Sequence, residues 1–203
     1  MQNFDLENEN GRSMIEMLGV LAIIGVLSVG GIAGYSKAML KYRVNKSVQQ
    51  ISLIASNIQT FFAPQGNYEG LNNIDVKKKA KLIPDEMWDG SNIRTGVGRF
   101  CQIFENYFNS GGNKEFILFI VDIDSVEACI ELMSQDWSNL THNLIGIDLN
   151  GSTMEDYVGC TPSDHVWCTG NSNTPFPIPL DTVVKNCECW QDNSCDGIQF
   201  KFK

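Results

Sequence analysis

A run of apolar residues near the start of the chain contains a single charged residue. Between Met14 and Tyr35, that residue is Glu16. At 1.5 Å per helical residue the run spans about 30 Å, which is the thickness of the hydrocarbon core of a bilayer. Its apolar residues cover every side of a helix, and its glycines are more typical of membrane helices than of soluble ones. The pattern predicts a transmembrane helix from Met14 to Tyr35.

The helical pattern continues beyond this run. No Pro or Gly occurs between Ser36 and Ala63, and apolar residues recur there at spacings of four and three. This stripe consists of Val44, Val48, Ile51, Ala55, Ile58 and Phe62. Such spacing is typical of an amphipathic helix, which Pro64 and Gly66 then end. We therefore expect one helix from Ser13 to Ala63, whose first half lies in lipid or in an assembly and whose second half docks on a globular domain.

Later patterns predict a small sheet with short helices. Alternating or continuous apolar runs predict strands at 98–104, 115–123, 144–149 and 198–202, with turns at 109–113 and at Asn150-Gly151. A helix is expected over 71–81, with its lysines on a solvated face, and another over 125–135. Asp124 and Glu127 resemble a capping box at the start of the second helix. The expected fold is α+β, with the long helix packed on an antiparallel sheet of about four strands.

Charge and cysteine content narrow the class of protein. The formal net charge of −9 does not favour nucleic-acid binding. None of the seven cysteines falls in the first 100 residues, and five of them crowd into a region, 152–197, with little regular pattern. The crowded cysteines are Cys160, Cys168, Cys187, Cys189 and Cys195. This clustering predicts disulfides formed in an oxidising compartment, and the odd total leaves one free thiol, for which Cys101 in a buried strand is the candidate.

Three other kinds of site, for zinc, for calcium and for catalysis by histidine, each lack part of the usual sequence pattern. A zinc site at Cys187-x-Cys189, completed by Cys195, Cys168 or His165, lacks the usual paired C-x-x-C spacing. Asp148-x-Asn150-Gly151 resembles the start of a calcium loop but has no acidic ligand at the end of one. Neither His142 nor His165 lies in a catalytic pattern, so no enzyme activity, metal or cofactor is expected.

The apolar run has a second interpretation, as a cleavable secretory signal. Secretory signals have a basic start and an apolar core of about 7–15 residues, whereas here the start is acidic and the run is longer. Gly31-Ile32-Ala33 would be the cleavage site of such a signal. The basic residues from Lys37 to Lys46 would place the C-terminal part in the cytoplasm by the positive-inside rule, whereas the cysteines favour an oxidising compartment. Charge alone does not settle the orientation.

The stretch GRSMIEMLGVLAIIGV resembles the class III signal of type IV pilins and pseudopilins. Gly11 matches the residue before the cut, and Glu16 falls at the fifth mature position. QGNYEGLNN with KLIPDEMWDG, VEACIELMSQDW and SCDGIQFKFK are similar to later parts of type IVb (PilS-like) pilins. The chain departs from the family in having Arg12 as its first mature residue, an acidic leader and no proline in the membrane helix.

The resemblance implies a division of the chain and a set of partners. Residues 1–11 would be a leader, 12–35 the transmembrane and filament-core half of the helix, 36–64 its amphipathic half, and 65–203 the globular head. A prepilin peptidase would cut between Gly11 and Arg12, with N-methylation of the new amine left open by the unusual Arg12. Glu16 would meet the N-terminal amine of a neighbouring subunit during assembly by the pilus machinery.

The resemblance also implies a disulfide and a location. By analogy with the family's C-terminal loop, Cys129 would pair with Cys195. The pairing of Cys160, Cys168, Cys187 and Cys189 is open, with two bridges from the first two to the last two favoured. The precursor would sit in the bacterial inner membrane with its N-terminus cytoplasmic.

The expected function is that of a structural subunit, a major or minor pilin of a type IV pilus-like filament on the cell surface or in the periplasm. The alternatives are a pseudopilin of a type II secretion-like system and, more distantly, a membrane-tethered or secreted disulfide-rich protein.

Overall fold

A computed structural model describes residues 9–105, 114–140, 143–148, 166–169, 172–175, 177–188 and 197–203. The chain divides into two compact units, Met1–Tyr42 and Arg43–Lys203. The second is called the head unit below. The expected turns at 109–113 and Asn150-Gly151 lie outside the described residues.

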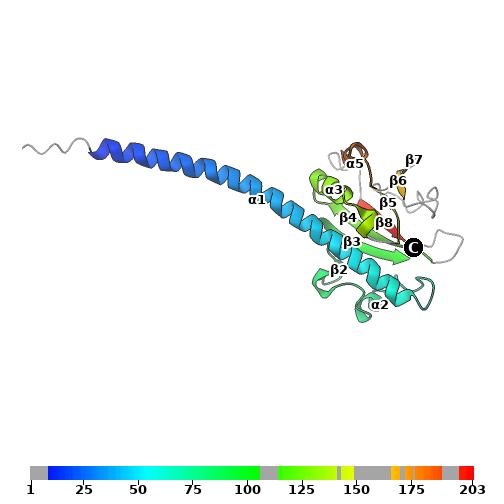
Figure 1. Cartoon of the computed structure of the whole chain (residues 1–203). Helices are drawn as coiled ribbons and strands as arrows, with labels where there is room; N and C mark the ends of the chain where they lie inside the picture. Colours follow the sequence, from blue (N-terminus) through cyan, green and yellow to red (C-terminus); the bar gives the residue numbers. More distant parts are fainter. Residues whose placement is uncertain are drawn as a thin grey trace, which may run out of the picture. The chain divides into compact units, whose positions relative to one another are not determined.

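A single helix, α1 (Glu9–Phe62), contributes to both units. Every residue of the expected apolar stripe is buried, and the most exposed of them, Val48, is 6% exposed. The stripe faces the protein because 3.6 residues per turn bring spacings of three and four to one side of the helix. In the head unit the Arg43–Phe62 part of α1 packs against the sheet (Figure 1). The sequence-based expectation of one long helix with an amphipathic second half is confirmed.

The head unit is built on an antiparallel sheet with strand order β1-β2-β3-β4-β8-β5. The four longer strands are β3 (Gly98–Glu105), β4 (Phe116–Ile123), β8 (Gly197–Phe202) and β5 (Leu144–Asp148). Two two-residue strands, β1 (Trp88–Asp89) and β2 (Asn92–Ile93), extend it at one edge through a turn at Gly90, whose φ of 64° suits glycine. The α+β fold class is confirmed, and the two short strands add to the four expected ones.

Aromatic rings connect α1 to the centre of the sheet. The ring centroid of Phe62 lies 5.7 Å from that of Tyr68, which lies 4.8 Å from Phe116. Phe116 in turn stacks on Phe202 at 4.9 Å, as cross-strand partners of β4 and β8. Such offset and edge contacts stabilise a core beyond the area they bury. The contacts join the end of α1 to two central strands.

Short helices complete the head unit. They are α2 (Ile74–Lys79), a 3-10 turn at Asp85–Met87, α3 (Val126–Met133), α4 (Trp137–Leu140) and α5 (Leu180–Cys187). A two-stranded sheet is formed by β6 (Val166–Thr169) and β7 (Ser172–Pro175). The region 152–197 therefore has more regular structure than its sequence suggested. The expected helix over 71–81 is shorter, because Asn73 caps it by accepting a hydrogen bond from the Asp75 backbone N–H.

The cap of α3 differs by one residue from expectation. Ser125 is the N-cap, and its hydroxyl accepts a hydrogen bond from the backbone N–H of Ala128 at 3.1 Å. Asp124 lies just before the helix and pairs with Arg43 instead. Serine and aspartate are about equally good caps, so the sequence did not distinguish them.

Candidate assembly site

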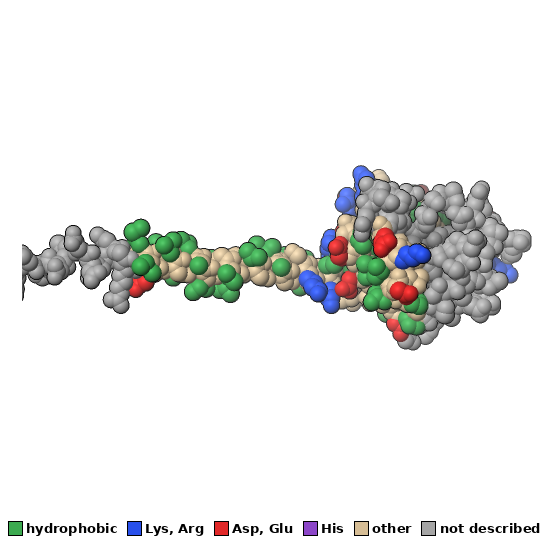
Figure 2. Space-filling view, turned by 90° about the horizontal axis from the view of Figure 1, so that it is seen from above, with side chains coloured by type: hydrophobic (Ala, Val, Ile, Leu, Met, Phe, Trp, Pro, Cys, Tyr) green, Lys and Arg blue, Asp and Glu red, His purple; other side chains and the backbone are tan. Residues whose placement is uncertain are grey.

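The first part of α1 presents apolar side chains that none of the described residues covers. Its large apolar side chains from Met14 to Tyr35 are between 53% exposed, at Ile24, and 75% exposed, at Val26. Figure 2 shows these hydrophobic side chains along the segment, with Lys and Arg side chains gathered beyond its C-terminal end. Among the described residues, this helix alone is long and apolar enough to cross a membrane. An apolar area of this size marks a surface that lipid or protein covers.

Two serine hydroxyls, one within the segment and one just after it, are satisfied by the helix itself. The hydroxyls of Ser28 and Ser36 donate to the carbonyls of Ile24 and Ile32, at 2.7 and 3.0 Å. In an apolar environment this removes the cost of an unpaired hydroxyl. A Cβ added at any glycine from Gly19 to Gly34 would meet nothing within 4 Å, so these positions leave gaps on the helix surface. Such gaps allow another helix to approach closely.

The residues expected to direct processing and assembly lie at the start of α1. Gly11 and Arg12 belong to the first turns of the helix, which begins at Glu9 rather than at the expected Ser13. The structure describes only the backbone of these two residues. Glu16 is exposed on the helix, at the N-terminal end of the apolar segment.

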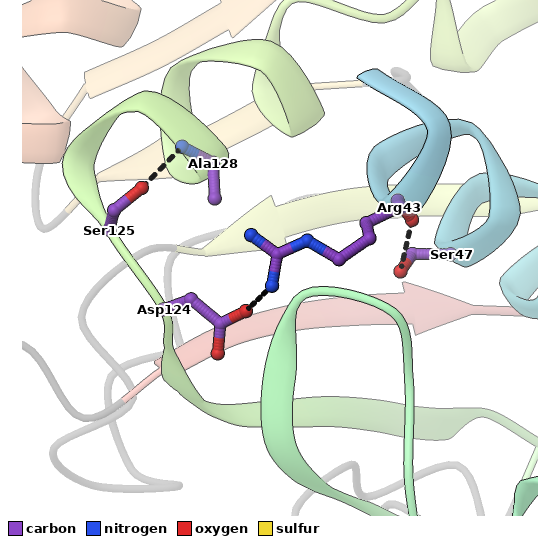
Figure 3. Close-up of polar contacts among 5 residues, drawn as sticks. All are labelled: Arg43, Ser47, Asp124, Ser125 and Ala128. Carbon is purple, nitrogen blue, oxygen red and sulfur yellow. Dashed lines mark hydrogen bonds and ion pairs between the residues drawn. The ribbon is translucent and has the colours of Figure 1, made fainter. Parts of the chain in front are cut away.

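The amphipathic part of α1 is anchored in the head unit by Arg43 (Figure 3). Its guanidinium lies 2.6 Å from the Asp124 carboxylate. The Arg43 carbonyl accepts a hydrogen bond from the Ser47 hydroxyl at 3.0 Å. Gly96 packs so closely on that carbonyl that a Cβ there would clash with it. The sequence does not predict this anchor, because Arg43 lies far along the chain from Gly96 and Asp124.

The disulfide differs from the expected one. Cys129 pairs with Cys187 rather than with Cys195, with the two Cα atoms 5.9 Å apart. Cys129 lies on the buried face of α3, and Cys187 ends α5, which packs on α3. The two helices therefore bring these sulfurs together, whereas the analogy with the family's loop pointed to the residue before the last strand. The bridge also excludes Cys187 as a zinc ligand and as a partner of Cys160 or Cys168.

The other cysteines fall into two groups. Cys160, Cys189 and Cys195 lie outside the described residues, and only the backbone of Cys168, in β6, is described. Cys101 carries a free, buried thiol, as the sequence suggested. Burial raises the pKa of this thiol from 9.0 to about 12, against a smaller opposite effect of the nearby Lys77 amine. No cluster of three or more metal-binding side chains occurs among the described residues.

One lysine of the expected solvated helix face is buried. Lys77 of α2 is 6% exposed, and its ammonium donates a hydrogen bond to the Ile103 carbonyl of β3. Burial lowers the pKa of Lys77 below its usual value of 10.5. The interpretation of the lysines as a solvated face was wrong for this residue, because α2 lies against the edge of the sheet.

These features define a class of protein. An uncovered apolar helical segment that continues into an amphipathic half, packed on an antiparallel sheet with a disulfide, is the architecture of a pilin-like structural subunit. Residues 38–172 match the Bundlin family, a type IV pilin-like family, and the chain belongs to it. The match begins after the apolar segment, so it is independent of the motif from Gly11 to Glu16. No curated protein matches the chain significantly.

Membership has consequences for function. Bundlin is a structural pilin family, not an enzyme family. It implies that the chain assembles into a pilus-type filament, and the long apolar helix is compatible with membrane anchoring before assembly.

Proposed function

We propose that this chain is a prepilin that a prepilin peptidase cuts between Gly11 and Arg12. The mature chain then assembles, as a major or minor pilin, into a type IV pilus-like filament. The observation that carries the proposal is the apolar segment from Met14 to Tyr35, which is exposed throughout and has room for close helix packing at its glycines. Assembly would bury this surface in the filament core, and lipid would cover it beforehand.

Glu16 has the role of an assembly residue in this proposal. A carboxylate at the start of an apolar helix is costly in an apolar environment unless a cation pairs with it. Cleavage at Gly11 creates such a cation, the α-amine of Arg12. On a neighbouring, axially displaced subunit that amine would pair with Glu16 and set the stagger between subunits.

The inner membrane is the proposed location before assembly, with the N-terminus in the cytoplasm. This orientation opposes the one favoured by Lys37 and Lys41, which follow the apolar segment. The Cys129–Cys187 disulfide supports it, because disulfides persist in the periplasm and are rare in the cytoplasm.

The mature N-terminus tests the cleavage. Wild-type chain recovered from cells should begin at Arg12 by mass spectrometry, and Gly11→Val should retain its leader. Gly19→Ala is the control glycine substitution, because a Cβ at Gly19 meets nothing within 4 Å and Gly19 lies outside the cleavage motif. Normal processing of Gly11→Val would refute the cut site. An N-terminus near Gly34 would support a secreted protein instead.

Assembly is tested separately with Glu16→Ala. This variant should be cleaved normally but give few filaments, when sheared cell-surface material is examined by electron microscopy. Glu69→Ala, which removes an exposed carboxylate of the head unit, should form filaments normally. Abundant filaments from Glu16→Ala would remove the pairing role. Wild-type chain that is processed but forms only short periplasmic filaments would identify a pseudopilin.

A further inference from the structure

A pocket of about 360 Å³ lies at one edge of the large sheet. The pocket lies beside the part of β3 that extends beyond the end of β2. Ile93 of β2 pairs with Cys101 of β3, and among the described strands none flanks β3 on this side beyond that point. The volume lies within the range of small-molecule sites, about 300–1,000 Å³.

The backbone at this edge is already hydrogen-bonded by side chains. Lys77 donates to the Ile103 carbonyl. The Asn72 side chain accepts from the backbone N–H of Glu105 and donates to its carboxylate, both at 3.0 Å. An added β-strand needs the free N–H and C=O groups of the edge. Because Asn72 and Lys77 take two of them, a small molecule fits this pocket better than an extended peptide.

The buried ammonium of Lys77 favours a ligand with a negative charge. Among the described residues, no carboxylate lies within 4 Å of its Nζ. Glu105 is held by Asn72, and Cys101 is a neutral thiol at ordinary pH, since burial raises its pKa to about 12. A buried cation without a counter-ion is costly, and an anion in the pocket removes that cost.

The remaining walls indicate what else the anion carries. The pocket is lined by the apolar residues Ile74, Ile93, Phe100 and Phe104 as well as by Lys77. Its polar lining residues are Asn72, Ser91, Asn92 and Gln102. We propose that this pocket binds a small organic carboxylate, whose anionic group pairs with Lys77 and whose apolar body lies against the apolar lining residues. This proposal does not depend on filament assembly.

Two probes that differ in charge test the proposal. Full-length protein in detergent is titrated calorimetrically with benzoate and with benzamide, which has a similar shape but no charge. Benzoate should bind roughly tenfold or more tightly, because a hydrogen bond to a charged group is stronger than one to a neutral group. Lys77→Met should abolish the preference. Lys78→Met should keep it, since Lys78 lies next to Lys77 but does not line the pocket.

The wild-type comparison stands even if Lys77→Met fails to fold, which its melting curve will show. Lys77→Arg, which keeps the charge, should retain a preference for benzoate. Equal binding of both probes, no binding of benzoate at millimolar concentration, or tighter binding of inorganic phosphate would each overturn the proposal. So would an unchanged preference in a folded Lys77→Met variant.

Discussion

The guanidinium of Arg43 lies 2.6 Å from the carboxylate of Asp124, so that helix α1 is tied to the residue just before helix α3. The backbone of Asp124 is also fixed, because its N–H donates to the Val97 carbonyl at 3.0 Å. Val97 and Gly96 precede β3, and Gly96 packs on the Arg43 carbonyl. One turn of α1, the start of β3 and the end of β4 therefore meet at a single point.

This ion pair should contribute modestly to stability. Its side chains are 42% and 37% exposed, and partly exposed pairs contribute about 0.2–1 kcal/mol. A double-mutant cycle with Arg43→Ala and Asp124→Ala should give a coupling energy in that range in chemical denaturation, and it should shrink in high salt. The Arg99–Asp122 pair is a control, because it is longer at 3.5 Å and more exposed, and its coupling should be smaller. No coupling at low salt would contradict the contact.

The roles of Asp124 and Ser125 can be separated by the same method. Ser125→Ala should cost about 1 kcal/mol, the usual value for a lost N-cap. That cost should persist in the Arg43→Ala background, whereas the cost of Asp124→Ala should largely disappear there. The opposite pattern, with Ser125→Ala neutral and Asp124→Ala costly in both backgrounds, would make Asp124 the cap.

The disulfide predicts both a peptide map and a loss of stability. Non-reducing digestion should yield a peptide that joins Cys129 to Cys187, and Cys195→Ser should leave it intact. Replacing Cys129 and Cys187 with alanine should cost about 2–5 kcal/mol, since the bridge closes a loop with a sequence separation of 58 residues. A peptide joining Cys129 to Cys195 from folded, non-reduced protein would refute the pairing.

The stability of the head unit should fall at alkaline pH because of Cys101. Its thiol has a pKa of 9.0 when unfolded and about 12 when folded, so between these values the unfolded chain loses a proton that the folded chain keeps. Unfolding is then favoured increasingly as the pH rises. Lys77 acts in the opposite direction, because its folded pKa is lowered and the unfolded chain holds more protons up to 10.5.

Cys101→Ala isolates the thiol. Between about pH 8 and about pH 11, the wild type should lose about 2–3 kcal/mol more free energy of unfolding than the variant. Denaturant midpoints followed by tryptophan fluorescence measure this difference, and comparing pH slopes removes the constant cost of the deleted side chain. Parallel slopes would show that Cys101 does not titrate as its burial requires.

Periodic elements were the predictable part of the fold. The stripe from Val44 to Phe62 specified one face of α1, and the apolar run at 115–123 specified β4, because their spacing depends on local geometry alone. Helix α5 was missed, although Leu180, Val183 and Cys187 have helical spacing. Eight residues among prolines, asparagines and cysteines give too short a periodic signal.

Contacts between distant segments were the unpredictable part. The choice of Cys187 over Cys195 depends on α5 packing against α3, and the burial of Lys77 depends on α2 lying at the edge of β3. Neither of these packing contacts produces a local pattern in the sequence. A lysine on a short basic helix is usually solvated, so burial of Lys77 has to be observed in the structure.

The position of β8 has a consequence for the order of events during synthesis. This strand, Gly197–Phe202, is buried along its whole length and lies between β4 and β5, although both precede it in sequence. A nascent chain that has emerged only as far as Cys187 already contains both flanking strands but not the one that joins them. The sheet of the head unit therefore cannot be completed until Phe202 has left the ribosome. Until then, the flanking edges are exposed to wrong pairing and are natural targets for a chaperone.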